Sequence, residues 1–100
     1  MNTLLQMNTY IEWFDSLRDK QAKARILARL RRVELDNFGD YHSVGEGVSE
    51  LRIHYGQGYR IYFMQHKKRL VILLAGGNKS TQDADIATAI QLASNLKELL

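Results

Sequence analysis

The chain of 100 residues contains 45% hydrophobic and 25% charged residues, which is typical of one globular domain with a single core. It has no cysteine, which excludes disulfides and thiolate metal sites and suits the reducing cytoplasm. The sequence starts without a basic segment followed by a long apolar run, and its longest apolar run, Leu70–Ala75, is too short to span a bilayer. We therefore expect a single cytoplasmic domain, residues 1–100, with no membrane partner.

Basic residues are concentrated in two parts of the chain, although the formal net charge is only +3. The segment from Arg18 to Arg32 holds seven cations and one acidic residue, Asp19. A second basic set lies in the middle of the chain and consists of Arg52, Arg60, Lys67, Lys68, Arg69 and Lys79. Such an uneven surface suits a polyanion or an acidic protein partner.

The first third of the chain predicts a short strand at residues 3–6, followed by two helices. Thr9 and Glu12 have the spacing of a capping box, so we expect the first helix to begin there. The second helix should run from about Asp19 to Leu35. Its apolar face consists of Ala22, Ile26, Leu30 and Val33, whereas Arg25, Arg29 and Arg32 share another face.

The remaining chain changes to the two-residue period of strands. Strands are expected at 50–55, 59–66 and 70–75, with Gly56-Gln57-Gly58 as the first turn. A final helix, capped by Ser80 or Thr81, should extend to about Leu99. The order β-α-α-β-β-β-α predicts an α+β fold in which a helical pair backs a small antiparallel sheet.

The stretch ELRIHYGQGYRIYF, residues 50–63, carries cations and titratable rings on one face of the predicted hairpin. If Tyr55 pairs with Tyr59, His54 faces Arg60 on that face. The same register sets Arg52 opposite Tyr62 and Glu50 opposite Met64. Two guanidiniums, an imidazole and a phenol would then form one patch.

This patch has the chemistry of a phosphate clamp, because two neighbouring arginines repel each other unless an anion lies between them. His54 could transfer protons near neutral pH, and Tyr59 or Tyr62 could stack on a base. The alternative is an ordinary solvated face, in which Glu46 or Glu50 forms ion pairs with the arginines.

Two further segments have both a binding and a structural interpretation. The loop Gly76–Thr81 places glycines and Lys79 before a helix and could bind an anion, or it could simply cap the helix. The basic helix could contact RNA or an acidic partner, or be a solvated face. His42, His54 and His66 lack metal-ligand spacing, so we expect no metal and no cofactor.

Two segments together carry a family resemblance: NFGDYHSVGEGVSELRIHYGQGYRIYF and LLAGGNKSTQDADIATA. They resemble the RelE/ParE toxin superfamily of type II toxin–antitoxin systems, and in particular its HigB-like addiction module killer proteins. The resemblance extends over nearly the whole chain, including WFDSLRD and AKARILARLRR. It implies a small curved antiparallel sheet with two N-terminal helices packed on it and a C-terminal helix.

The resemblance also implies a toxin that inhibits translation as a ribosome-dependent mRNA endoribonuclease. In such enzymes the 2′-OH attacks the adjacent phosphate without a metal ion. Arg52, Arg60 and Lys79 would then stabilise the phosphate. His54 would be the general base or acid, with Tyr59 or Tyr62 as alternatives. Arg25, Arg29 and Arg32 would contact ribosomal RNA.

One departure from the family pattern keeps other functions open. Many ribosome-dependent members carry a catalytic Tyr or His near the C-terminus, whereas no aromatic residue or His follows His66 here. A ParE-like, non-enzymatic inhibitor of DNA gyrase is one alternative, and a weakly active toxin that mainly binds its antitoxin is another. The implied partners are mRNA, the ribosome and a helix-turn-helix antitoxin encoded next door, with operator DNA contacted only through that antitoxin.

Overall fold

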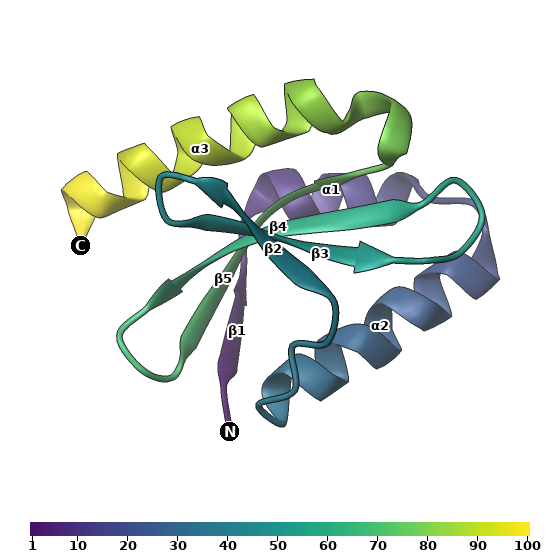
Figure 1. Cartoon of the computed structure of the whole chain (residues 1–100), viewed down its shortest axis with the longest axis horizontal. Helices are drawn as coiled ribbons and strands as arrows, with labels where there is room; N and C mark the ends of the chain where they lie inside the picture. Colours follow the sequence, from purple (N-terminus) through teal and green to yellow (C-terminus); the bar gives the residue numbers. More distant parts are fainter.

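A computed structural model describes all 100 residues and has a five-stranded sheet at its centre (Figure 1). The strands lie in the order β1-β5-β4-β3-β2. β1 pairs in parallel with β5, and all other neighbours are antiparallel. The strand bounds are β1 (Thr3–Gln6), β2 (Tyr41–Gly45), β3 (Val48–Ile53), β4 (Tyr59–His66) and β5 (Leu70–Gly77).

Three helices cover the sheet: α1 (Asn8–Ser16), α2 (Lys20–Glu34) and α3 (Gln82–Leu99), the last preceded by a 3-10 turn, η1 (Lys79–Thr81). The Asp19 side chain caps α2 by accepting from the amides of Gln21 and Ala22, at 2.9 and 3.2 Å. None of the helices is long and apolar enough to cross a membrane.

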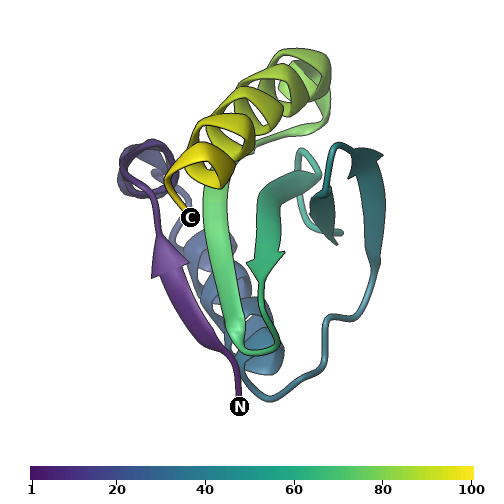
Figure 2. The same cartoon turned by 90° about the vertical axis from the view of Figure 1, so that its left-hand side faces the viewer.

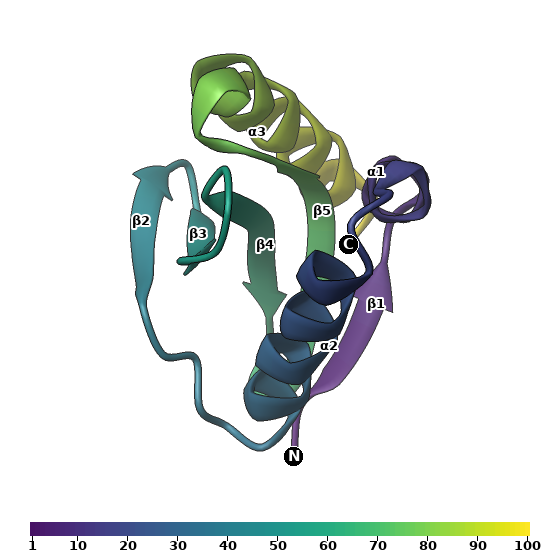
Figure 3. The same ribbon diagram turned by 90° about the vertical axis from the view of Figure 1, so that its right-hand side faces the viewer.

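The helices lie on opposite faces of a curved sheet (Figures 2 and 3). α1 and α2 pack on one face, where Ile26 joins a cluster with Leu51 and Ile61. α3 packs on the other face, where Ala89 and Ala93 meet Tyr62, Met64 and Leu74. The predicted α+β class and helix arrangement are confirmed.

The capping box predicted at Thr9 is wrong. α1 begins at Asn8, and the capping position before it is Met7, which makes no side-chain cap. The Met7 amide instead donates to the carbonyl of Leu73 at 2.9 Å, which ties the start of α1 to β5. Tertiary contact with the sheet therefore determines where this helix begins.

The predicted hairpin register is also wrong, by two residues. Ile53, rather than Tyr55, pairs with Tyr59, so that Arg52 lies opposite Arg60 and Glu50 opposite Tyr62. The loop spans five residues, 54–58, instead of three. The sequence prediction also omitted β2, which pairs with β3 and completes the sheet.

Gly76 and Gly77 were expected in a loop but end strand β5, where both are buried. The Trp13 ring lies directly over Gly76, so a Cβ at this position would overlap it. The Asp85 carboxylate approaches Gly77 in the same way. Both glycines therefore permit close packing, of α1 and α3 respectively, at the end of the strand that leads to Lys79.

Candidate functional site

A cavity of about 570 Å³ opens at the free end of the β3–β4 hairpin. Three cations line it: Arg52 from β3, Arg60 from β4 and Lys79 from η1. Its other lining residues are Ile53, His54, Tyr55, Gly56, Gln57, Gly58 and Tyr59. The cavity therefore gathers the predicted cations and His54, together with Tyr59, but it does not include Tyr62.

A buried carboxylate holds the two arginines together. Glu50 is 0% exposed, and its Oε1 accepts from Arg52 Nε at 2.7 Å and from Arg60 Nη1 at 2.9 Å. Its Oε2 accepts from Gln82 Nε2, at the start of α3, at 3.0 Å. The ion pairing considered as an alternative is therefore present, but it is buried rather than solvated.

This arrangement leaves positive charge in excess at the cavity. Burial raises the pKa of Glu50, but hydrogen bonds from Arg52 and Gln82 and the charges of both arginines outweigh it and hold the pKa below its usual range. The Glu50 carboxylate also raises the pKa of Arg52. One carboxylate therefore balances two guanidiniums, and Lys79 adds a further charge at the rim, so the site can accept an anion.

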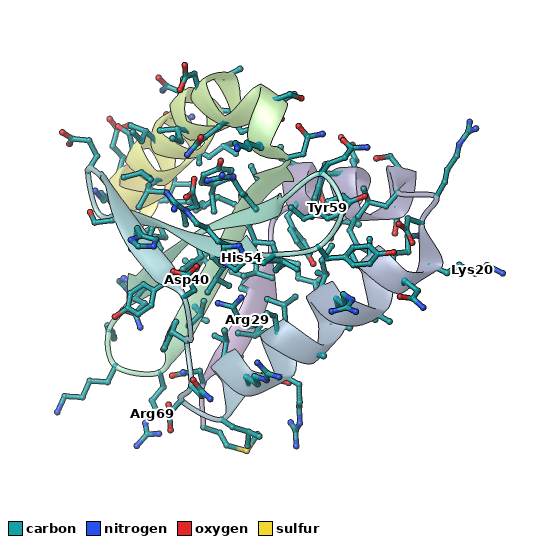
Figure 4. All side chains as sticks on the ribbon, turned by 45° about the vertical axis from the view of Figure 1, so that its right-hand side comes forward. Lys20, Arg29, Asp40, His54, Tyr59 and Arg69 are labelled. Carbon is teal, nitrogen blue, oxygen red and sulfur yellow. The ribbon has the colours of Figure 1, made fainter.

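His54 does not face Arg60 as predicted, because it lies in the five-residue loop beyond β3. Its Nε2 is 2.6 Å from Oδ2 of Asp40, and the Nε2 of His42 is 2.8 Å from Oδ1 of the same carboxylate. Figure 4 shows His54 and Asp40 beside each other. Hydrogen bonds from His54 and then His42 hold the pKa of Asp40 below its usual range.

Arg29, predicted to contact RNA, uses its guanidinium inside the protein. Its Nη1 donates to the carbonyl of Arg52 at 2.5 Å, and its Nη2 donates to those of Phe38 and Asp40, both at 2.9 Å. Burial lowers its pKa, more than the charge of Asp40 raises it. Arg29 thus fastens the segment before β2 to the end of β3.

A second cavity, of about 320 Å³, lies on the α2 side of the hairpin end. Arg25, Arg29 and Arg32 line it, so the predicted clustering of these arginines is confirmed. Ile53 and His54 line both cavities. His54, with a side chain 74% exposed, therefore stands at the boundary between two cationic cavities.

The two tyrosines proposed as alternatives are buried. Tyr62 is 0% exposed, lies in the cluster under α3 and does not line the cavity. Burial and the Glu50 charge raise its pKa, which disfavours a base. Tyr59 lines the cavity but is only 7% exposed and packs against Trp13 and Tyr55. We therefore leave Tyr62 out of the site.

Lys79 is placed by contacts between η1 and the hairpin turn. Asn78 Nδ2 donates to Gln57 Oε1 at 3.0 Å, and the Lys79 amide donates to the Gln57 carbonyl at 3.4 Å. The Asn78 side chain also accepts from the Ser80 amide and caps the turn. The capping and anion-site interpretations of this loop are thus compatible, since the cap orients an exposed Lys79 beside the cavity.

Asp40 and Gln82 belong to the site but were not predicted. Asp40 reaches His54 because the segment before β2 runs beside β3, and β2 itself was missed. The spacing of Asp40 and His42, two residues apart, was the available signal, since such residues share a face of a strand. No group of three or more His, Asp or Glu side chains is arranged to hold a metal ion.

The fold and the site define a small α+β protein with a cationic cavity at a hairpin end, built around a buried glutamate. Residues 12–98 match the family described as phage derived protein Gp49-like, and the chain belongs to this family. An uncharacterized protein of Haemophilus influenzae (strain KW20 Rd) is 51% identical over 88 residues, which cover 88% of this chain and 89% of that protein.

Proposed function

We propose that this protein is the toxin of a type II toxin–antitoxin system and cleaves mRNA on the ribosome. The observation that carries the proposal is the single cavity lined by Arg52, Arg60, Lys79 and His54. Membership of the phage-derived Gp49-like family and the resemblance to HigB-like toxins support the same function.

In the proposed reaction the 2′-OH of one nucleotide attacks the adjacent phosphorus. A base removes the 2′-OH proton, the bond from phosphorus to the 5′-oxygen breaks, and an acid protonates that oxygen. The products are a 2′,3′-cyclic phosphate and a 5′-OH. Arg52, Arg60 and Lys79 are suited to stabilise the charge that develops on the phosphate, and His54 to move the proton.

The second cavity extends the proposed RNA contact beyond the scissile phosphate. Arg25 and Arg32 are exposed on α2 and line this cavity together with His54. We propose that they bind the backbone of ribosomal RNA or mRNA. The same basic surface would be covered by the antitoxin, a small helix-turn-helix protein that carries the complex to its operator.

Mapping of transcript 5′ ends after brief induction tests the proposal. Discrete new ends within translated codons are expected, and Arg52→Ala and Lys79→Ala should suppress both the ends and growth arrest. Arg69→Ala is the matched control, because Arg69 is exposed in the β4–β5 turn away from the cavity.

Two results would overturn the proposed nuclease activity. One is undiminished toxicity in the folded Arg52→Ala/Lys79→Ala double variant, with folding checked by circular dichroism. The other is gyrase-linked DNA breakage without new mRNA ends, which would favour ParE-like inhibition. Little growth arrest, with neither new mRNA ends nor DNA breakage, would instead indicate a weakly active toxin that mainly binds its antitoxin.

A further inference from the structure

Asp40 bridges two histidines on the exposed face of the hairpin end. Its Oδ2 lies 2.6 Å from Nε2 of His54, and its Oδ1 lies 2.8 Å from Nε2 of His42. The shorter contact is to the histidine that lines both cavities.

The backbone of Asp40 is fixed from two sides, so the carboxylate has a defined position. Its carbonyl accepts from the Arg52 amide at 3.1 Å and from Arg29 Nη2 at 2.9 Å. The preceding Gly39 has φ of 66°, and a Cβ there would lie 3.0 Å from the Arg29 guanidinium. The chain therefore enters β2 in one conformation, with Arg29 packed beneath it.

The contact with Asp40 selects a tautomer of His54. A carboxylate accepts hydrogen bonds and does not donate them, so the neutral ring must carry its proton on Nε2. Nδ1 then has a free lone pair that can accept a proton. The His54 side chain is exposed, and its contact with Asp40 is the one hydrogen bond within the protein that orients its ring.

We infer that Asp40 is a positioning residue, which holds His54 as the Nε2–H tautomer with Nδ1 available to the RNA between the two cationic cavities. This inference rests on the proposed ribonuclease function. In the reaction, Nδ1 would take the proton of the attacking 2′-OH, and Asp40 would stabilise the resulting imidazolium through the proton on Nε2.

The first test reads the tautomer directly and needs no substrate. In long-range ¹H–¹⁵N spectra of the ¹⁵N-labelled protein at a pH where His54 is neutral, His54 should show the Nε2–H pattern. Asp40→Asn should replace that pattern with a tautomer mixture, because an amide can donate to the ring as well as accept. His42→Gln removes the other imidazole and should leave the His54 pattern unchanged.

The second test measures RNA cleavage by translating ribosomes. Asp40→Asn should lower kcat about 10–100-fold, the size of an impaired general base, and change KM less than about threefold because the cavity cations remain. Asp40→Glu should recover part of kcat, since it restores an acceptor. Asp36→Asn, in the same segment but paired with the N-terminus and Arg69, should match the parent.

The outcomes separate this inference from the proposed function. A His54 ring protonated on Nδ1 in the parent, or an unchanged tautomer and kcat in Asp40→Asn, would overturn the role of Asp40. A parent protein that cleaves no RNA would overturn the ribonuclease, whatever the tautomer. A tautomer change without a kcat change in Asp40→Asn would show that His54 is not the base, and would overturn the inference while leaving the ribonuclease intact.

Discussion

Glu50 is the residue around which the candidate site is organised. It is fully buried, yet it stays ionised because three donors from β3, β4 and α3 surround its carboxylate. Arg60 is only 11% exposed and has no other acidic partner. Removing the Glu50 charge would leave a buried guanidinium uncompensated, which is costly.

Glu50 should make stability depend on pH at the acid end. Because its folded-state pKa is lowered, its contribution is complete above the unfolded value of about 4.3 and is lost as the pH falls through the folded value. Glu50→Gln should therefore cost about 1–3 kcal/mol at pH 7, and the difference from the parent should shrink below about pH 4. Urea unfolding of both proteins between neutral and acid pH measures this difference in unfolding free energy.

The control for this prediction is Glu12→Gln, at an exposed position of α1, which should change the unfolding free energy by less than about 0.5 kcal/mol. Curves for the parent and Glu50→Gln that stay parallel down to acid pH would contradict the assigned role of Glu50.

The Tyr62 side chain places an unpaired polar group inside the core. Its hydroxyl is buried and makes no hydrogen bond, which costs about 1–3 kcal/mol relative to a paired group. Tyr62→Phe should therefore raise the unfolding free energy by about 1 kcal/mol and leave RNA cleavage unchanged. Tyr41→Phe, at an exposed position, should have little effect on either. Loss of cleavage in a folded Tyr62→Phe protein would return Tyr62 to the site.

At the scale of elements, the hairpin shows why sequence alone predicts faces better than register. A shift of two residues returns every side chain to its own face, so the apolar pattern is the same in both registers. Arg52 and Arg60 were therefore correctly placed on one face. The register is set by the pairing of Ile53 with Tyr59, which both lie in the core cluster. This pairing places His54 and Tyr55 in the loop.

Strand β2 was missed for a different reason. It is short and lies at an edge of the sheet, and four of its five residues are exposed, so it lacks the apolar alternation that signals a strand. The contribution of Asp40, just before β2, to the site was therefore missed as well. The position of Asp40 beside His54 depends on pairing with β3, which no local pattern encodes.

The contact of Trp13 with Gly76 predicts a strong effect of a very small change. Gly76→Ala would push the ring away from β5 and should lower the unfolding free energy by about 1–3 kcal/mol. In a double-mutant cycle, adding Trp13→Ala should relieve the overlap, so the double variant should lose less unfolding free energy than the sum of the losses in the two single variants. Thermal unfolding of the four proteins measures the coupling, and strict additivity would contradict it.

At the scale of the whole molecule, the separation of the basic residues matters more than the net charge of +3. The cavity cations sit at one end of β4, whereas Lys67, Lys68 and Arg69 lie in the turn at its other end. An RNA bound at the cavity should therefore be sensitive to one basic set and not to the other.

Salt titration of RNA affinity measures this difference. Binding of a short single strand should weaken with salt, and Lys79→Ala should reduce the slope of log K against log salt by about 0.7, the value for one phosphate contact. Lys68→Ala should leave the slope unchanged, because Lys68 lies in the distant turn. Equal changes of the slope in both variants would indicate that RNA binds without preference for the cavity end of β4.

The parallel pairing of β1 with β5 has a consequence for how the protein is made. Thr3–Gln6 are translated before the other four strands, yet their partners are Leu70–Leu73, so this edge strand stays unpaired until residues 70–73 have also been translated. Lys79 and the Gln82 ligand of Glu50 follow later still. A chain under synthesis that still lacks residues 79–82 therefore has no assembled cavity, so the proposed RNA contact can form only after these residues have been translated.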